Sequence, residues 1–238
     1  MSAATTQPLK ITLSGYGPPE TSFSVALKMI GDRMEAKFPG ALDLKYVFNI
    51  MDLGYKAEDN LWLVDRGILT LAYQSSSYFT DTVPELGFLD LPFLFADNSV
   101  ARKAMDGELG RRMAEAMEAR MSCRILGWFE NGMRHLSNKL RPVRTPADLA
   151  GMSIRILQSD VHKRTFELLG AWPMRMDLSE ARKMIVAGTI DAQENPLTNT
   201  VTYGVHKFHK FHTLTSHFYL SRPIFIHRST FDAWPKPV

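Results

Sequence analysis

Hydrophobic residues in the first third of the chain follow two different spacings. Apolar and polar side chains alternate over 9–16 and 42–50, which is typical of half-buried strands. Apolar side chains recur at helical spacing over 21–38, and 55–68 have the pattern of a shorter helix. A short strand is expected over 69–75. This order predicts a parallel or mixed sheet with crossover helices.

The middle of the chain is less regular. Residues 83–97 carry many aromatic side chains and two prolines, so we expect neither a regular helix nor a regular strand there. Residues 98–121 have the pattern of a long helix. Residues 123–132 read as a strand that runs into a turn.

A second α/β unit is predicted in the last part of the chain. We expect a helical turn and then a strand over 144–157, a helix over 159–171, and a strand followed by a helix over 172–188. Two strands are expected over 211–220 and 222–228, and the start of a helix over 229–235. Two α/β units joined by extended strands predict a cleft between two lobes.

Composition narrows the class of protein. The chain has 238 residues, 45% of them hydrophobic, which is enough for one large domain or two small ones. The net charge of +3 is too small to predict nucleic-acid binding. Cys123 is the only cysteine, which excludes an intrachain disulfide and a cysteine zinc cluster.

The sequence also bears on location. No run of 18 apolar residues occurs, so we expect no membrane insertion. The polar start, MSAATTQPLK, does not resemble a secretory signal. Composition alone therefore leaves two readings open, a cytosolic protein or a secreted one whose leader is not present in this chain.

Four motifs carry a resemblance to a known family. They are PELGFLDLPFLF, GMSIRILQS, LGAWPMRMDLSEARKMIVAGTIDAQENPL and SHFY. In this order and spacing the chain resembles the substrate-binding proteins of tripartite ATP-independent periplasmic (TRAP) transporters, the DctP type. The resemblance covers nearly the whole chain.

This resemblance implies a fold and an activity. The expected fold is α/β and two-lobed, like that of periplasmic binding proteins, with a ligand cleft between lobe I (9–132 plus 221–238) and lobe II (133–220). Family members continue past the last residue through a long C-terminal helix, so we expect the C-terminal helical part of lobe II to be absent here. The implied protein is a periplasmic receptor without enzymatic activity or cofactor. It would bind a small organic acid and deliver it to a TRAP membrane permease.

Three residues match the carboxylate site of the family. They are Arg155 in GMSIRILQ, Arg134 in WFENGMRHLSN and Asn195 in QENP. The chemistry is compatible, because a planar guanidinium binds a carboxylate through two hydrogen bonds and an amide can donate a third. From chemistry alone, Arg155 could instead form an internal salt bridge and Arg134 could be solvated. Asn195 before a proline could be simple turn chemistry, with Glu194 as scaffold.

Further binding residues are expected around these three. Trp172 and Leu178 lie near the predicted cleft, although most tryptophans belong to a core. Tyr73 and Gln74 follow a first-lobe strand at its carboxyl end, the usual ligand edge of an open α/β sheet. Glu20 is a weaker candidate of the same kind.

Other chemistries have little support in the sequence. His206, His209 and His212 are three apart, but the interleaved lysines would repel a metal cation, so we interpret this segment as a solvated, partly packed face. No nucleophile motif or phosphate loop occurs. Two alternatives to a transport receptor remain: a sensory module with the same site, or a cytosolic α/β enzyme acting on a carboxylate.

Overall fold

The computed structural model describes residues 7–236. Within that range the chain divides into two compact units, unit 1 (7–74, 117–127 and 223–236) and unit 2 (75–116 and 128–222). Residues 75–116 group with unit 2, whereas we expected them in lobe I with the rest of 9–132. Strands β4 (Cys123–Asn138) and β8 (Phe211–His227) run through both units.

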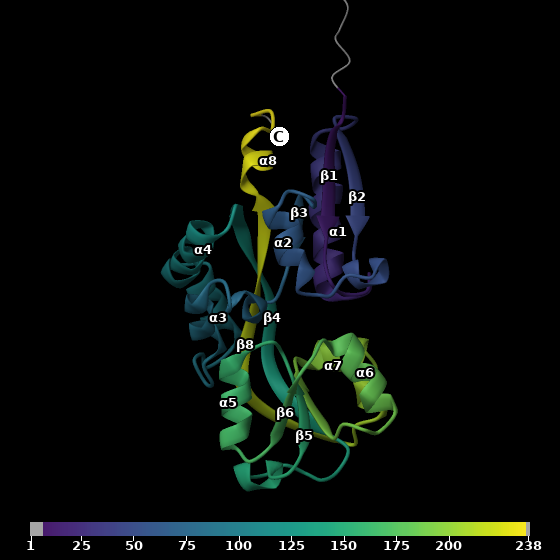
Figure 1. Ribbon diagram of the computed structural model, residues 1–238, viewed down its shortest axis with the longest axis vertical. Helices are drawn as coiled ribbons and strands as arrows, with labels where there is room; N and C mark the ends of the chain where they lie inside the picture. Colours follow the sequence, from purple (N-terminus) through teal and green to yellow (C-terminus); the bar gives the residue numbers. More distant parts are fainter. Residues whose placement is uncertain (1–6, 237–238) are drawn as a thin grey trace, which may run out of the picture. The chain divides into compact units, whose positions relative to one another are not determined.

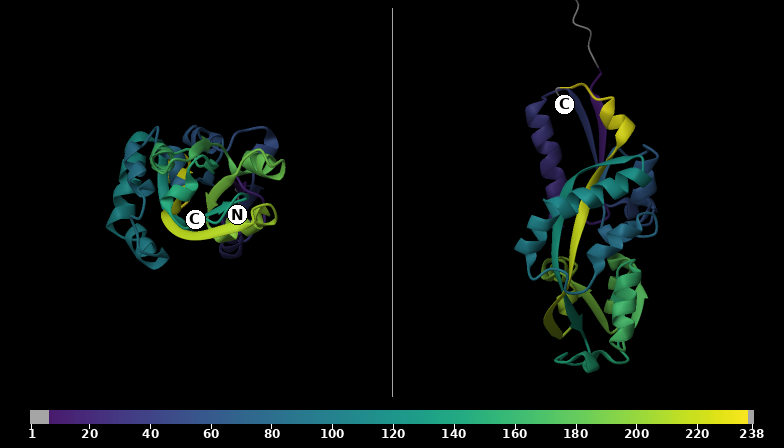
Figure 2. Two further views of the ribbon diagram at one scale, coloured as in Figure 1. Left: turned by 90° about the horizontal axis from the view of Figure 1, so that it is seen from below. Right: turned by 90° about the vertical axis from the view of Figure 1, so that its left-hand side faces the viewer.

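Unit 1 is an α/β unit around a short parallel sheet. Its elements are β1 (Leu9–Ser14), α1 (Ser22–Lys37), β2 (Leu42–Val47), the 3₁₀ helix η1 (Ile50–Leu53), α2 (Asp59–Asp65), β3 (Leu71–Tyr73) and α8 (Arg228–Asp232). β1 pairs in parallel with β2 and β3, and β3 pairs antiparallel with β8. The predicted mixed sheet with crossover helices is thus confirmed. Helix α1 lies beside β1 and β2 in Figure 1 and in the right-hand view of Figure 2.

Unit 2 contains more of the secondary structure. Its elements are η2 (Ser76–Phe79), η3 (Pro84–Asp90), α3 (Asn98–Met105), most of α4 (Glu108–Arg120), η4 (Pro146–Leu149), β5 (Ser153–Ile156), α5 (Asp160–Leu168), β6 (Trp172–Arg175), α6 (Leu178–Val186), β7 (Ala192–Asn195), α7 (Leu197–Thr202) and η5 (Val205–Lys207). β5 pairs in parallel with β6 and β7, and β4 pairs antiparallel with β7. The strand order of the whole sheet is β2-β1-β3-β8-β4-β7-β5-β6.

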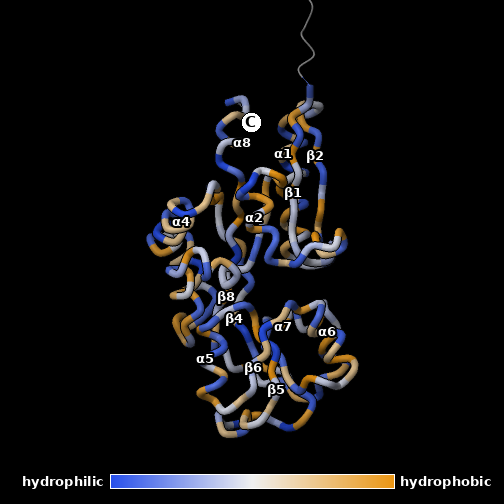
Figure 3. The backbone as a smooth tube through the Cα atoms, viewed as in Figure 1, coloured by the Kyte–Doolittle hydropathy of each residue, from blue (hydrophilic) through white to orange (hydrophobic). Residues whose placement is uncertain are grey.

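Two hydrophobic clusters pack on the two faces of the unit 2 sheet. One joins Phe166 of α5 to Ile154 and Leu136 of the sheet. The other joins Leu178 and Ile185 of α6 to Met176, with Met174 of β6 packed against it. Figure 1 shows α5 on one side of β5 and β6 and α6 with α7 on the other. Figure 3 shows the mixed hydrophobic and hydrophilic positions along these helices, as expected when one side of a helix is buried.

Three of the predicted elements differ in the structure. The strand expected over 123–132 does not end in a turn there but continues to Asn138 as β4. The helix expected over 98–121 is broken into α3 and α4. Gly110 permits this break, because a Cβ there would lie 1.7 Å from the carbonyl oxygen of Met105. The strands expected over 211–220 and 222–228 form the single strand β8. Pro223 lacks an N–H, but its carbonyl oxygen accepts from the backbone N–H of Gln74 at 3.3 Å, so the strand still forms a hydrogen bond at this residue.

Among residues 7–236, no helix combines the length and the apolar character needed to cross a membrane.

Candidate functional site

Arg155 is a buried cation without a counter-charge in the described chain. It lies in β5 between two buried isoleucines, and only 1% of its surface is exposed. Its Nε donates to the carbonyl oxygen of Met176 at 2.8 Å. No aspartate or glutamate within 7–236 forms an ion pair with it, and its other two guanidinium nitrogens donate to no residue in that range. A buried guanidinium left in this way is costly, so Arg155 is suited to an anion from outside the chain.

Strand register places other polar side chains on the face of Arg155. Arg155 is paired with Gln193 in β7, and Gln193 is paired with Ser137 in β4. Asn195 follows Gln193 by two positions and therefore faces the same side of the sheet. Glu194, between them, faces the opposite side.

Asn195 is held by other amides. Its Nδ2 donates to Oε1 of Gln193 at 2.7 Å, and its Oδ1 accepts from Nδ2 of Asn199 at 3.3 Å. Asn199 also donates to Oδ1 of Asn131 at 3.2 Å. Asn195 is 2% exposed, so these bonds fix a buried amide rather than a surface turn.

Arg134 is already neutralised within the protein. Its Nε and Nη2 donate to the two carboxylate oxygens of Glu194, and Nη2 also donates to the Glu194 carbonyl at 2.7 Å. Both side chains are buried. Burial alone would raise the pKa of Glu194, but the charge and hydrogen bonds of Arg134, with His217 3.7 Å from the Glu194 carboxylate, outweigh it and hold that pKa well below its usual range.

The three residues matched to the family's carboxylate site therefore divide between two faces. Arg155 and Asn195 share the face of the α6 cluster, and Arg134 lies with Glu194 on the other face. A ligand role for Arg134 stays a prediction, because the structure accounts for its charge without a ligand. Glu194 has the scaffold contacts that we expected of it.

The remaining unit 2 candidates do not lie next to Arg155 in the strand register. Trp172 is 71% exposed at the start of β6, where it pairs with Ser153 rather than with Arg155. Leu178 is buried in the α6 cluster at the first residue of that helix. The core packing of Leu178 explains that residue without a ligand, and nothing in the structure explains the exposed Trp172. The roles of both in binding stay predictions.

The unit 1 candidates are described separately, as part of that unit. Tyr73 is buried at the end of β3, and its hydroxyl shares a 2.9 Å hydrogen bond with that of Ser24. Gln74 is also buried, and its Nε2 donates to the Ala57 carbonyl at 2.6 Å. Glu20 is exposed in the loop before α1. Their contact with a ligand stays a prediction.

Gln193, Ser137 and Thr200 belong to the polar network around Asn195 but were not among the predicted site residues. Gln193 donates to the hydroxyls of Ser137 at 2.8 Å and Thr200 at 3.2 Å, and Ser137 shares a 2.9 Å bond with Nδ1 of His209. His209 is 2% exposed, so the solvated face that we expected for its segment does not extend to this residue. The only signal in the sequence was the run Gln193-Glu194-Asn195, whose distant partners no local pattern specifies.

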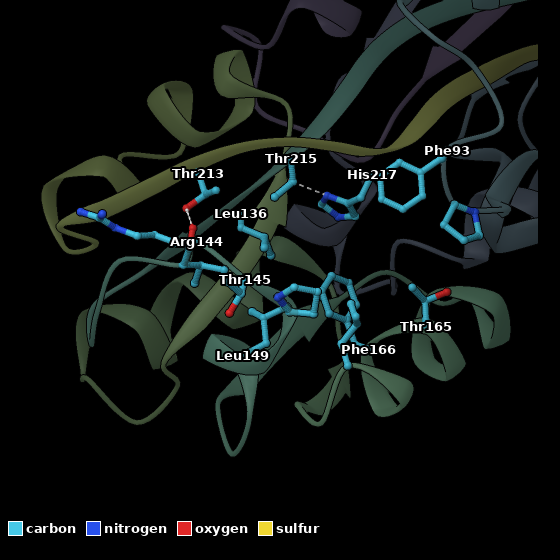
Figure 4. A pocket seen from close by; sticks show the side chains of 14 residues that line it. Phe93, Leu136, Arg144, Thr145, Leu149, Thr165, Phe166, Thr213, Thr215 and His217 are labelled. Carbon is cyan, nitrogen blue, oxygen red and sulfur yellow. Dashed lines mark hydrogen bonds between the residues drawn. The ribbon is translucent and has the colours of Figure 1, made fainter.

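An apolar groove of about 280 Å³ lies on the other face of unit 2. Figure 4 shows Leu136, Phe166 and His217 along it, with Phe93 at one end. Its lining comes from the face that carries Glu194, and Arg144 is its one arginine. This groove therefore lacks the polar donors that surround Arg155.

Metal and nucleophile chemistry find little support in the described residues. Within 7–236 no group of His, Cys, Asp and Glu side chains is arranged to hold a metal ion. Burial, with the nearby charges of Asp65 and Glu118, raises the pKa of the Cys123 thiol to about 12, so its thiolate is scarce at neutral pH.

Known proteins resemble this chain over most of its length. The 2,3-diketo-L-gulonate-binding periplasmic protein of Escherichia coli (strain K12) is 33% identical over 219 residues, which are 92% of this chain and 66% of that protein. The C4-dicarboxylate-binding periplasmic protein DctP of Rhodobacter capsulatus is 27% identical over 236 residues, 99% of this chain and 70% of that protein.

Solved structures agree with the fold. A TRAP periplasmic solute-binding protein from Sulfurospirillum deleyianum with bound succinate superposes with a TM-score of 0.89 at 27% identity, covering 97% of this chain and 74% of that one. A second, from Polaromonas sp. JS666 bound to D-erythronate, gives 0.88 at 26% identity, covering 96% and 75%. The predicted α/β fold of this class is confirmed.

The chain spans only part of the length of the curated relatives that it matches, 66% in the example from Escherichia coli. A family profile described as "Bacterial extracellular solute-binding protein, family 7" matches residues 13–238, nearly all of the sequence. The match agrees with the motifs and the fold. The chain therefore belongs to the DctP family of bacterial extracellular solute-binding proteins.

Proposed function

We propose that this chain is the ligand-binding part of an extracytoplasmic receptor that holds a small organic acid by its carboxylate. The observation that carries the proposal is the buried guanidinium of Arg155, which has no acidic partner within 7–236. Asn195 supplies a donor on the same face of the sheet. The bound acids named for its relatives, succinate and D-erythronate, all carry a carboxylate.

The hydrogen bonds of such a site could supply much of the free energy of micromolar binding. A micromolar dissociation constant requires about 8 kcal/mol. Hydrogen bonds to charged groups contribute about 1.5–3 kcal/mol each. Two bonds from Arg155 and one from Asn195 would therefore supply much of the affinity, with the remainder from burial of the rest of the ligand.

The role of Arg155 in this account is binding without turnover. The carboxylate replaces the missing counter-charge, and the Nε bond to Met176 holds the planar guanidinium in one orientation. In the transport proposal the loaded receptor passes the acid to a TRAP membrane permease, and the chain acts outside the cytoplasm.

Titration of the purified chain tests this proposal. Succinate, D-erythronate and 2,3-diketo-L-gulonate should raise the melting temperature, since a ligand that binds only the folded state stabilises it. Succinamide, which has the size of succinate but no carboxylate, is the matched control and should give no shift. Equal shifts from succinate and succinamide would refute carboxylate recognition.

An enzyme is the competing function. The same incubation, followed by analysis of the acids by mass spectrometry, should recover each acid unchanged. Conversion of any acid at a rate that depends on Arg155 would favour the enzyme over the receptor.

A further inference from the structure

We propose that Gln193 is a positioning residue that turns the amide of Asn195 so that one of its N–H bonds is available to a ligand acceptor. This inference rests on the proposed carboxylate site. Gln193 is fully buried in β7 and is the register partner of Arg155. It bonds at both ends of its amide, to Asn195 on one side and to Ser137 and Thr200 on the other.

The partners of Gln193 determine which way its amide points. The Thr200 hydroxyl donates to the carbonyl oxygen of Pro196 at 3.3 Å, and a carbonyl can only accept. With its proton used there, Thr200 offers Gln193 only a lone pair. The NH₂ group of Gln193 must therefore face Thr200 and Ser137, and its carbonyl oxygen must face Asn195.

His209 reinforces the same direction. Ser137 accepts from Gln193 and so has its own proton left for Nδ1 of His209, 2.9 Å away. Burial lowers the pKa of His209 to about 4, which keeps the ring neutral and its Nδ1 able to accept at neutral pH. The chain of donors thus runs from Asn195 through Gln193 and Ser137 to His209.

The orientation of Asn195 follows from that of Gln193. Because the oxygen of Gln193 faces it, Asn195 must turn its NH₂ toward Gln193. Its own oxygen is then satisfied by Asn199 at 3.3 Å. One of its two N–H bonds goes to Gln193, and the other has no acceptor within 7–236. A buried donor of this kind fits a carboxylate or hydroxyl oxygen and disfavours an ammonium group.

Gln193 also has to be neutral. A glutamate at this position would place a carboxylate on the strand position next to Arg155. That carboxylate would compete with an external acid for the guanidinium. The amide therefore orients Asn195 without neutralising Arg155.

Coupling between two substitutions tests this role. Gln193→Leu, Asn195→Ala and the double variant are titrated by calorimetry with the acid that the wild type binds most tightly among succinate, D-erythronate and 2,3-diketo-L-gulonate. Each single change should weaken binding about tenfold, the value of one hydrogen bond of about 1.4 kcal/mol. The double variant should bind no more weakly than Asn195→Ala alone, because Gln193 acts through Asn195. If the two losses multiply, Gln193 has only an independent structural role and the inference is wrong.

Two further variants separate the effect of Gln193 from general damage to the protein. Ser137→Ala removes one hydrogen bond of Gln193 and keeps those to Thr200 and Asn195. It should weaken binding less than Gln193→Leu does, and this loss should be absent when Asn195 is already alanine. The variant therefore tests the same role if Gln193→Leu folds poorly. Ser153→Ala removes a 2.8 Å hydrogen bond to Asp191 near the same strands but outside this network, and it should bind like the wild type. Loss of binding in Ser153→Ala would assign the effects to general damage.

A measurement without ligand separates this inference from the proposed function. In NMR spectra the side-chain amide proton of Asn195 that is bonded to Gln193 should exchange slowly in the wild type and in Ser153→Ala, and quickly in Gln193→Leu. Unchanged exchange in Gln193→Leu would overturn the positioning role whether or not any acid binds. If Arg155→Ala binds acids as tightly as the wild type, the carboxylate site itself fails, whatever the exchange of Asn195 shows.

Discussion

Arg134 and Glu194 form a buried ion pair across β4 and β7, on the opposite face of the sheet from Arg155. The two arginines thus differ in function although both are almost completely buried. The charge of Arg134 is satisfied inside the protein, and that of Arg155 is satisfied by no described carboxylate. The proposed ligand site depends on this difference.

Glu194→Gln should strongly destabilise the fold. It leaves the buried guanidinium of Arg134 without its counter-charge, which costs about 3–5 kcal/mol in comparable pairs. Urea unfolding followed by circular dichroism measures the change. Asp32→Asn, which breaks the exposed pair with Lys28, is the matched control and should cost less than about 1 kcal/mol. Equal losses in the two variants would contradict the assignment of Glu194 as the counter-charge.

Stability should depend on pH through His209. Its pKa falls from 6.5 to about 4 on folding, so the unfolded chain binds the proton more readily. Neutral His209 makes its full contribution to the free energy of unfolding above pH 6.5. This contribution, up to about 3 kcal/mol, is lost as the pH falls from 6.5 toward 4. His209→Asn keeps an acceptor for Ser137 but cannot titrate. Urea unfolding at several pH values should show a shallower decline for this variant, and parallel curves would refute the prediction.

Gly110→Ala should lower the melting temperature. Alanine favours a helix by about 1 kcal/mol over glycine, but the added Cβ would collide with the carbonyl of Met105 at the junction of α3 and α4. Overpacking of this kind costs about 1–3 kcal/mol. Calorimetry compares this variant with Gly127→Ala, where an added Cβ meets no atom within 4 Å. A higher melting temperature for Gly110→Ala would show that the junction relaxes freely.

Cys123 should be almost unreactive in the folded protein. Its thiol is buried, and burial raises its pKa to about 12. Iodoacetamide should therefore label it slowly at pH 8 and quickly in urea, as followed by mass spectrometry. Comparable rates in both conditions would indicate that the strand around Cys123 opens readily.

The sequence predicted the features that depend on residues close together along the chain. A strand was predicted in the last part of 144–157, and β5, which contains Arg155, lies there. The helices were predicted from apolar spacing in the same way. Where α3 separates from α4, the cause is a close approach of two backbones at Gly110, which periodicity does not report.

The sequence could not predict which polar residues are partners. Arg134 and Glu194 are 60 positions apart, and Ser137 and His209 are 72 apart. Each contact is created by strand pairing or by the return of a distant loop, so local patterns carry no trace of it. For the same reason the motifs assigned Arg155 and Arg134 to one carboxylate site, and only the register of β4, β5 and β7 separates their faces.

Binding of the ligand carboxylate by Arg155 is best tested by calorimetric titration of Arg155→Ala with the acid that the wild type binds most tightly. Arg164→Ala, an exposed arginine on α5, is the matched control. Loss of two charge-assisted hydrogen bonds should weaken binding at least about a hundredfold, since they contribute about 3–6 kcal/mol together. Arg155→Ala should keep the melting temperature of a folded protein, and Arg164→Ala should bind like the wild type. Undiminished affinity in Arg155→Ala would contradict the claim that this buried arginine holds the carboxylate.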